Sequence, residues 1–232
     1  MTRASSIVLA ALFALGAALL GGIRPGQADE GAFIIPPTAS DEPATDRHSA
    51  TAVLAGGCFW GVQGVFQHVQ GVTQALSGYA GGDADSASYE RVSAGNTRHA
   101  EAVRITYDPT QISYGQLLQI YFSVAHDPTQ LNRQGPDSGR QYRSTIFAAN
   151  AQQRRIAEAY IAQLNQTGVY DKPLATTLED LTTFYPAEAY HQDYLTLNPH
   201  SPYIVINDQP KIANLAKLFA ERYRDTPVLV NP

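Results

Sequence analysis

The chain has 232 residues, a length typical of one domain, and 44% of them are hydrophobic, which is enough to form a core. Its formal charge is −5, and beyond residues 1–28 it has 14 basic and 21 acidic residues. A chain without a basic excess is not expected to bind nucleic acid, because neutralising phosphates requires a basic face. The single cysteine excludes an intramolecular disulfide and a cysteine-based zinc site within one chain.

The first 28 residues have the pattern of an export signal. Arg3 precedes an apolar stretch from Ile7 to Leu20, and a segment of small and polar residues ends at Ala28. We expect cleavage near Ala28 and a location in the bacterial periplasm, with a retained membrane anchor as the alternative. Residues 29–50 contain prolines and charges without periodicity, and they are interpreted as a flexible leader before a domain over residues 51–232.

A glycine-rich turn containing the only cysteine follows the first predicted strand. The apolar run Ala52–Ala55 predicts this strand, and helical spacing of apolar residues follows from Val62. Gly56 and Gly57 permit a tight turn and leave room for another molecule to approach the backbone. Cys58 then lies at a helix start, where the dipole and unpaired N–H groups would lower its pKa and favour a thiolate. The alternative is a small buried residue.

The middle of the chain alternates between strand-like and helix-like segments. Ser113 and Gln116 match a capping box, and Asp108-Pro109 ends a well-alternating strand. The predicted elements are a strand over 72–79, a short helix from Ser88 to Val92, a strand over 100–107, a helix from Ser113, and a long polar loop over 126–141.

The same alternation continues to the carboxyl end. The predicted elements are a strand over 144–147, a helix capped by Asn150 and Gln153 and reaching Leu164, a strand over 175–181, an aromatic helix after 184–186, and an amphipathic helix over 211–223. No repeat or interdomain linker is visible. The fold class is therefore predicted as α+β, with a mixed or antiparallel sheet and packed helices.

One acid and two phenols are candidate proton donors. Glu101 shares a strand face with Val103 and Ile105, so its carboxyl would point toward the core and have a raised pKa. The alternative is a solvated glutamate at a strand end. Tyr89 and Tyr142 are candidate hydroxyl donors, although a single tyrosine is more often a residue at the edge of a core.

Other motifs are incomplete. Gly56 to Gly61 has the glycine spacing of a phosphate-binding loop, but Val62 stands where the lysine is required. The six histidines lack pairs at i, i+3 or i, i+4, so no metal is expected. A hydrolase using Cys58, a histidine and an aspartate stays possible on residue types, as does a non-catalytic aromatic binding module.

Longer motifs resemble the A type of peptide methionine sulfoxide reductase. The resemblance extends over about residues 52–223. Its motifs are Gly56–Gly61, Gly78–Gly82, Gly95–Val103, His126–Pro128, Asn132–Gly135, Asp137, Gln141–Ser144, Phe184–Glu188 and Tyr190–Gln192. Arg98 departs from the glycine that the family often has there. The tail Asn198–Tyr203 lacks the resolving cysteines of many members, which implies the single-cysteine subtype.

The resemblance implies a two-layer sandwich with a ferredoxin-like core, and reduction of methionine S-sulfoxide, free or in proteins. Cys58 matches the nucleophile, and Glu101, Tyr89 and Tyr142 match the groups that polarise the sulfoxide oxygen. Further matches are Phe59 and Trp60 for the methyl pocket, Asp137 near the substrate, and His191 as a weaker candidate. No cofactor is implied, and a thioredoxin-like or glutaredoxin-like thiol supplies electrons to a monomer.

Overall fold

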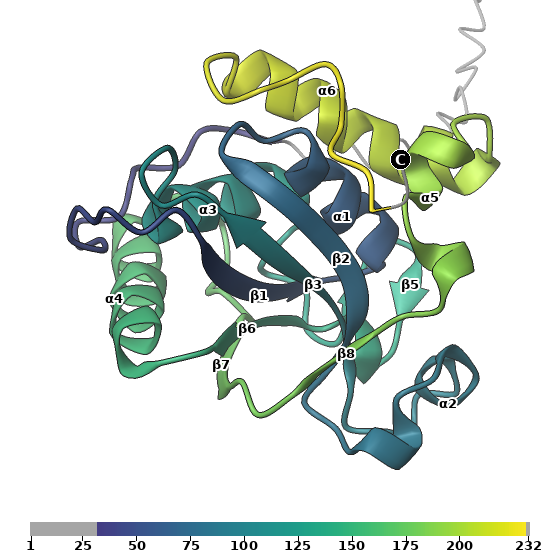
Figure 1. Cartoon of the computed structure of the whole chain (residues 1–232). Coiled ribbons are helices and arrows are strands. Elements are labelled where there is room, and N and C mark those ends of the chain that lie inside the picture. Colours follow the sequence, from purple (N-terminus) through teal and green to yellow (C-terminus); the bar gives the residue numbers. More distant parts are fainter. Residues whose placement is uncertain (1–31, 231–232) are drawn as a thin grey trace, which may run out of the picture.

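A mixed sheet of six strands lies at the centre of the protein (Figure 1). The computed structural model describes residues 32–230, so the predicted export signal and residues 29–31 lie outside the described part. The strand order is β7-β6-β1-β3-β2-β8, and every neighbouring pair is antiparallel except the parallel pair β6 and β7. The strands are β1 (Ala50–Gly56), β2 (Val72–Ala80), β3 (Ala100–Tyr107), β6 (Ser144–Ala148), β7 (Thr177–Asp180) and β8 (Phe184–Pro186).

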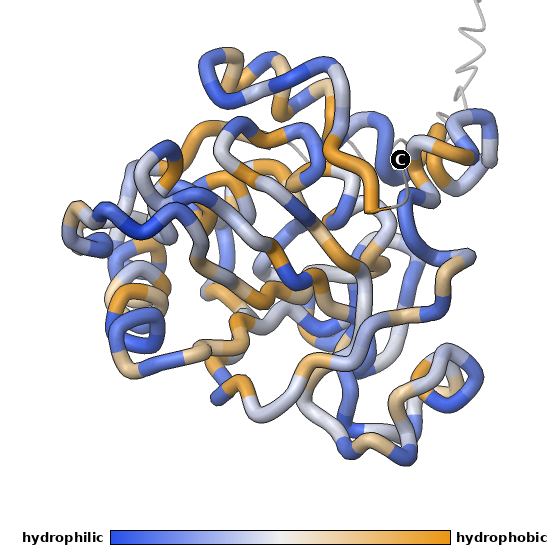
Figure 2. The backbone as a smooth tube through the Cα atoms, viewed as in Figure 1, coloured by the Kyte–Doolittle hydropathy of each residue, from blue (hydrophilic) through white to orange (hydrophobic). Residues whose placement is uncertain are grey.

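Helices cover one face of this sheet. Those next to the sheet are α1 (Phe59–Gln67), α3 (Tyr114–Ile120) and α4 (Ala151–Thr167). The other helices are α2 (Tyr89–Ser93), α5 (Tyr194–Leu197) and α6 (Gln209–Leu218), of which α5 and α6 contact α1. The main hydrophobic core lies between the sheet and α1, α3 and α4, while α6 packs on α1 through the buried Leu215. Figure 2 shows the hydrophobic backbone stretches gathered along the central strands and hydrophilic ones in the outer loops. The α+β architecture is confirmed.

Strand β3 separates two cores as its alternation predicts. Val103 and Ile105 belong to the main core, whereas Ala100 and Ala102 belong to a small cluster on the opposite face. Because side chains alternate along a strand, Glu101 is on the same face as Val103. It is 2% exposed, so the predicted inward orientation of its carboxyl is confirmed.

Two predicted helix starts are confirmed by their caps. Ser113 and Gln116 form the reciprocal capping box at α3, and the Asn150 side chain accepts from the backbone N–H groups of Gln152 and Gln153 at α4. At α2 the helix is present, but the Ser88 side chain does not cap it. The Glu188 carboxylate accepts from the Tyr89 N–H in its place, at 2.9 Å.

The predicted aromatic helix after 184–186 is wrong. Residues 184–186 form the edge strand β8, Ala189–His191 form a short 3₁₀ turn, and α5 has only four residues. Asp193 interrupts the segment with a φ of 58°, and its N–H donates to the buried Gln63 side chain. Tertiary hydrogen bonds therefore override a helical pattern here. Helix α6 begins at Gln209, earlier than predicted. It also ends earlier than predicted, at Leu218, because Phe219 leaves helical geometry.

The predicted long loop over 126–141 contains short regular pieces. Strands β4 (Arg133–Gln134) and β5 (Asp137–Ser138) form a small hairpin, and a 3₁₀ turn over Arg140–Tyr142 follows. This hairpin places Gln134 and Asp137 over the turn that holds Cys58.

Residues 32–49, within the segment expected to be a flexible leader, make specific contacts with the domain. Ile35 is fully buried, and its carbonyl accepts from the Gln119 side chain at 2.8 Å. The Tyr160 hydroxyl donates to the Pro36 carbonyl, and Asp41 accepts from the Gly115 N–H. Nowhere in residues 32–230 does a helix combine the length and apolar character that crossing a membrane requires.

Candidate active site

Cys58 lies in the turn between β1 and α1, at the N-cap position of the helix. Gly57 has a φ of +92°, which favours glycine. A Cβ at Gly56 would meet the His126 ring at 2.8 Å, and one at Gly57 would meet the Gln134 side chain at 2.5 Å. The room that the glycines leave is therefore filled by the protein's own side chains, which fix the turn. The sequence suggested that this room would let another molecule approach the backbone, and that expectation is wrong.

The pKa of Cys58 differs from the expectation of a lowered value. Burial raises the pKa of the thiol well above its ordinary value, and the nearby carboxyl groups of Glu101 and Asp208 raise it further. The backbone N–H of Trp60 at the helix start lowers it, as predicted, but this effect is smaller. The shift is therefore opposite to the lowered pKa that the helix start alone predicts, and that prediction is wrong.

Glu101 is positioned as an acid beside this thiol. Its Oε2 accepts from the backbone N–H of Phe59 at 3.1 Å, one residue after Cys58. Burial raises the pKa of its carboxyl to about 8, because the charged form loses its hydration, and Asp137 adds to the shift. At neutral pH the group is therefore mainly protonated and can donate a proton.

Two phenols approach the same point from separate elements. Tyr89 begins α2, and Tyr142 ends the 3₁₀ turn after the β4–β5 hairpin. Burial raises the pKa of both hydroxyls, and Glu101 and Cys58 raise them further. Asp137 also contributes to both shifts. Cys58, Glu101, Asp137 and the two tyrosines are therefore close enough to influence one another electrostatically. Because their pKa values are raised, both hydroxyls stay protonated and can donate hydrogen bonds.

Trp60 is held as an aromatic wall next to the thiol. Its ring stacks on Tyr194 with centroids 3.8 Å apart, and Tyr203 meets it edge-on at 5.8 Å. Its Nε1–H donates to His191 Nδ1 at 3.2 Å. Phe59 is almost fully buried and packs on His191 at 5.1 Å. The aromatic residues expected to form a methyl pocket therefore lie together, with His191 fixing the orientation of the indole.

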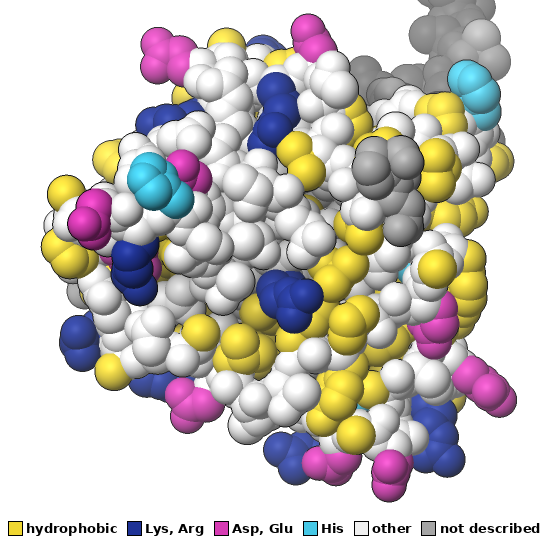
Figure 3. Space-filling view, in the orientation of Figure 1, with side chains coloured by type: hydrophobic (Ala, Val, Ile, Leu, Met, Phe, Trp, Pro, Cys, Tyr) yellow, Lys and Arg dark blue, Asp and Glu magenta, His cyan; other side chains and the backbone are white. Residues whose placement is uncertain are grey.

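An apolar surface extends outward from this wall. Figure 3 shows hydrophobic side chains gathered over α5 and β8 on the face that it presents. Tyr190 and Leu197 are each 64% exposed, and Leu197 ends the helix whose first residue stacks on Trp60. The surroundings of the site thus suit an apolar ligand.

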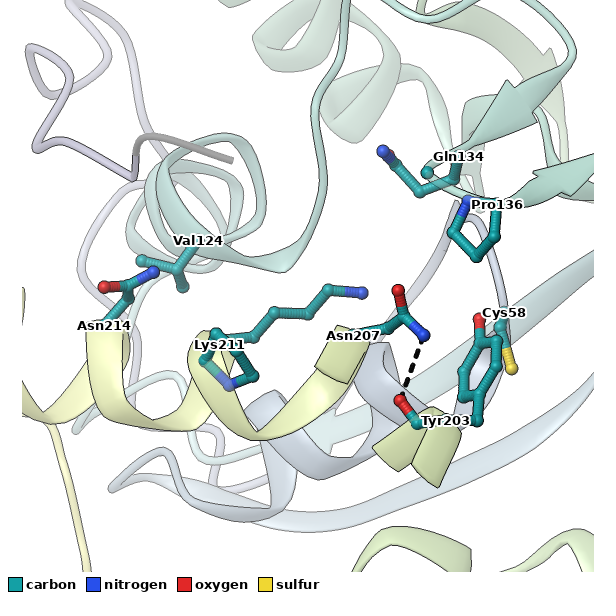
Figure 4. Close-up of a pocket in the computed structure, with 10 residues that line it drawn as sticks. Cys58, Val124, Gln134, Pro136, Tyr203, Asn207, Lys211 and Asn214 are labelled. Atoms are coloured by element: carbon teal, nitrogen blue, oxygen red, sulfur yellow. Dashed lines mark hydrogen bonds between the residues drawn. The ribbon is translucent and has the colours of Figure 1, made fainter. Parts of the chain in front are cut away.

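A narrow cavity of about 30 Å³ lies on the other side of Cys58. It is large enough for one or two water molecules. Figure 4 shows Cys58 and Tyr203 side by side at one end and Val124 and Asn214 at the other. The lining residues are Cys58, Val124, Gln134, Gly135, Pro136, Tyr203, Asn207, Pro210, Lys211 and Asn214.

No histidine among residues 32–230 hydrogen-bonds to the thiol. His126 is engaged with Ser144 Oγ at 2.7 Å, and burial lowers its pKa to about 3. His191 accepts from Trp60. The geometry therefore offers no imidazole base for a cysteine hydrolase. In the same part of the chain, no group of three or more His, Cys, Asp or Glu side chains is arranged to hold a metal ion.

Comparison with known proteins decides the family. The sequence model of the family described as Peptide methionine sulfoxide reductase matches residues 50–223. The chain belongs to this family. A relative from Mesorhizobium japonicum named Peptide methionine sulfoxide reductase MsrA 2 is 65% identical over 182 residues, which are 78% of this chain and 93% of the relative. A protein of the same name from Synechocystis sp. is 46% identical over 204 residues, covering 84% and 95%.

Solved structures of the family have the same fold. Mxr1 from Saccharomyces cerevisiae in reduced form has a TM-score of 0.60 and 32% identity, covering 68% of this chain and 91% of the yeast chain. Methionine sulfoxide reductase A of Corynebacterium diphtheriae has a TM-score of 0.57 and 31% identity, covering 75% and 92%. The predicted family membership, the fold class and the assignment as an oxidoreductase are confirmed.

Sequence reasoning missed two residues next to Cys58. The Tyr203 hydroxyl donates to Asp137 Oδ2 and joins the carboxyl-terminal segment to the β4–β5 hairpin. Asp208 is fully buried close to the thiol. The absence of cysteines was the one feature of the tail Asn198–Tyr203 that entered the prediction. Its aromatic residue within a stretch free of Lys, Arg, Asp and Glu, from Tyr194 to Asn207, was a signal that could have indicated Tyr203.

Proposed function

We propose that the chain reduces the S epimer of methionine sulfoxide, free or in proteins, and so repairs oxidised proteins. The observation that carries the proposal is the pairing of one thiol, Cys58, with a carboxyl group, Glu101, that is protonated at neutral pH. A sulfoxide sulfur becomes electrophilic when its oxygen accepts a proton or strong hydrogen bonds. Glu101 supplies the proton, and Tyr89 and Tyr142 donate hydrogen bonds to the same oxygen.

The reaction balances without a cofactor. The Cys58 sulfur attacks the sulfoxide sulfur, and the oxygen passes to Cys58 while the methionine thioether leaves. The thiol and the sulfoxide become a sulfenic acid and a thioether, so Cys58 loses the two electrons that the sulfoxide gains. Glu101 donates its proton to the sulfoxide oxygen and is reprotonated with the proton that the Cys58 thiol releases, so it is unchanged at the end. Phe59 and Trp60 take the methyl group, and Asp137 orders the polar side of the substrate.

Recycling requires an external thiol, because the chain contains no second cysteine. A thioredoxin-like or glutaredoxin-like thiol attacks the sulfenic acid, releases water and forms a mixed disulfide, which a second thiol of the reductant resolves. The amino-terminal pattern supports the proposal that this takes place in the periplasm after export. We infer a monomer, because one chain supplies every proposed catalytic group.

We expect strict selectivity for one sulfoxide epimer. The proton donors and the aromatic wall contact different substituents of the sulfur, so only one configuration presents its oxygen and methyl group correctly. Purified S and R sulfoxides of N-acetylmethionine, assayed in parallel with dithiothreitol, measure this. Turnover of the S epimer alone is expected, and equal rates for both would contradict the geometry.

Without added thiol, the enzyme is expected to release about one methionine per chain and then stop. The reason is that Cys58 sulfenic acid has no internal thiol to resolve it. Rapid quench measures the burst, and mass spectrometry after trapping with dimedone locates the sulfenic acid. Cys58→Ala is the matched control and gives neither burst nor adduct. Sustained turnover without reductant would rule out the proposed reaction.

A further inference from the structure

A buried pair of opposite charges lies beneath the helix that Cys58 begins, and the proposed reaction does not use it. Asp208 ends a π-helical turn over Ile204–Asp208 and is fully buried. Its Oδ1 is 3.2 Å from Lys211 Nζ in α6, and Lys211 is 8% exposed. Among the described residues, Asp208 Oδ2 has no hydrogen-bond partner.

Both charged groups touch the first turn of α1. A Cβ at Gly61, the third residue of this helix, would meet Asp208 Oδ1 at 2.1 Å and Lys211 Nζ at 2.9 Å. Glycine is therefore required at this position for the pair to reach the helix backbone. Lys211 also lines the narrow cavity that ends at Cys58 (Figure 4). Both members of the pair thus reach the helix that Cys58 begins, and Lys211 also faces the cavity beside the thiol.

A carboxylate at this place opposes ionisation of the thiol. The positive end of the α1 dipole stabilises negative charge, and both the Asp208 carboxylate and a Cys58 thiolate would lie near it. The two negative charges would also repel each other. The cation of Lys211 offsets the charge of Asp208. The pair therefore controls how much negative charge the helix start already carries.

Two other carboxyl groups in residues 32–230 act on Cys58. Glu101 on β3 is mainly protonated at neutral pH, and Asp137 on β5 accepts from Tyr203. The titratable groups around the thiol from all packed elements are Glu101, Asp137, Asp208, Lys211, Tyr89, Tyr142 and Tyr203.

We propose that Asp208 and Lys211 are a positioning pair that sets the reactivity of Cys58 by balancing opposite charges against the first turn of α1. The proposal rests on Cys58 being the nucleophile of the proposed function. It gives the carboxyl-terminal segment, which lacks a resolving cysteine, a role in tuning the one cysteine that the chain has.

Alkylation of Cys58 by iodoacetamide across a pH series tests the pair in the full chain. Asp208→Asn removes the negative charge, so alkylation at pH 7 is expected to be about tenfold faster, with a lower midpoint. Lys211→Gln removes the cation, so alkylation is expected to be slower, with a higher midpoint. This shift should be smaller than that of Asp208→Asn, because burial raises the pKa of Asp208 and Lys211 no longer lowers it in the variant. The double variant should lie between the two single variants.

Matched controls separate charge from packing. Lys211→Arg keeps the cation and should retain the wild-type midpoint, and Lys217→Met, on the exposed side of the same helix, should not change it. If Asp208→Asn does not fold, the alkylation midpoints of Lys211→Gln and Lys211→Arg are compared in its place, and a higher midpoint in Lys211→Gln alone supports the proposal. Shifts below about twofold, or both single variants shifting the same way, would overturn the proposal. Because alkylation needs no sulfoxide, a wild type that alkylates as expected but reduces no sulfoxide would refute only the proposed function.

Discussion

Replacing Cys58 with serine is expected to slow the reduction of methionine sulfoxide by at least about 10⁴-fold, because the reaction would lose its nucleophile. Serine has nearly the same size and keeps the N-cap position, so α1 should stay folded. Its hydroxyl ionises far less readily than a thiol, and oxygen cannot take up the sulfoxide oxygen as sulfur does. The measurement is methionine released per minute with excess dithiothreitol, with circular dichroism to verify folding.

Histidine variants supply the contrast. None of the six His→Ala variants is expected to lose activity on the scale of Cys58→Ser, because no imidazole hydrogen-bonds to the thiol among the described residues. A cysteine hydrolase would depend on one histidine and would cleave a generic ester. A binding module would retain its function in Cys58→Ser. Each alternative therefore predicts a pattern that these variants distinguish.

Local patterns in the sequence were sufficient for the elements that form the site. The strand that ends at Gly56, the helix that begins at Phe59 and the inward face of Glu101 all follow from alternation and glycine placement over a few residues. The cap at Asn150 likewise depends only on neighbours. In each case, the interaction that determines the structure lies within one turn or one strand.

The properties that could not be predicted depend on distant segments. The pKa of Cys58 is set by burial and by Glu101 and Asp208, which are 43 and 150 positions later in the numbering of the chain. The prediction from the helix dipole at the start of α1 takes account of neither burial nor these two carboxyl groups. The aromatic helix failed for the same reason, since Asp193 is held out of helical geometry by a hydrogen bond to Gln63 in α1.

The roles of the site residues come from chemistry and resemblance more than from pattern. Tyr89 and Tyr142 lie on a short helix and a 3₁₀ turn, where no periodicity distinguishes them from other tyrosines in a chain that has 13. Only the long motifs around them indicated which two to choose. The fold then brought both hydroxyls to the same carboxyl group.

Glu101→Gln is expected to slow sulfenic acid formation by about 10²–10⁴-fold, the usual contribution of general acid catalysis. Glutamine has the same shape, and its carbonyl can still accept from the Phe59 N–H, so the Cys58 turn should keep its geometry. The amide cannot transfer a proton to the sulfoxide oxygen. Single-turnover rapid quench measures this step apart from recycling, and Glu158→Gln, an exposed residue on α4, is the matched control.

The pH profile separates this role from a structural one. The pKa of Glu101 is raised to about 8, so its acid form, and the rate that depends on it, is present below about pH 8 and lost as the pH rises through that value. Ionisation of Cys58 acts in the opposite direction, because the thiolate fraction grows with pH. Above pH 8, the rate of the wild type should therefore level off or decrease with increasing pH. The rate of Glu101→Gln should only increase with pH, because of Cys58 ionisation. A variant within about threefold of the wild type, with the same profile, would mean that Glu101 holds the Cys58 turn in place and donates no proton.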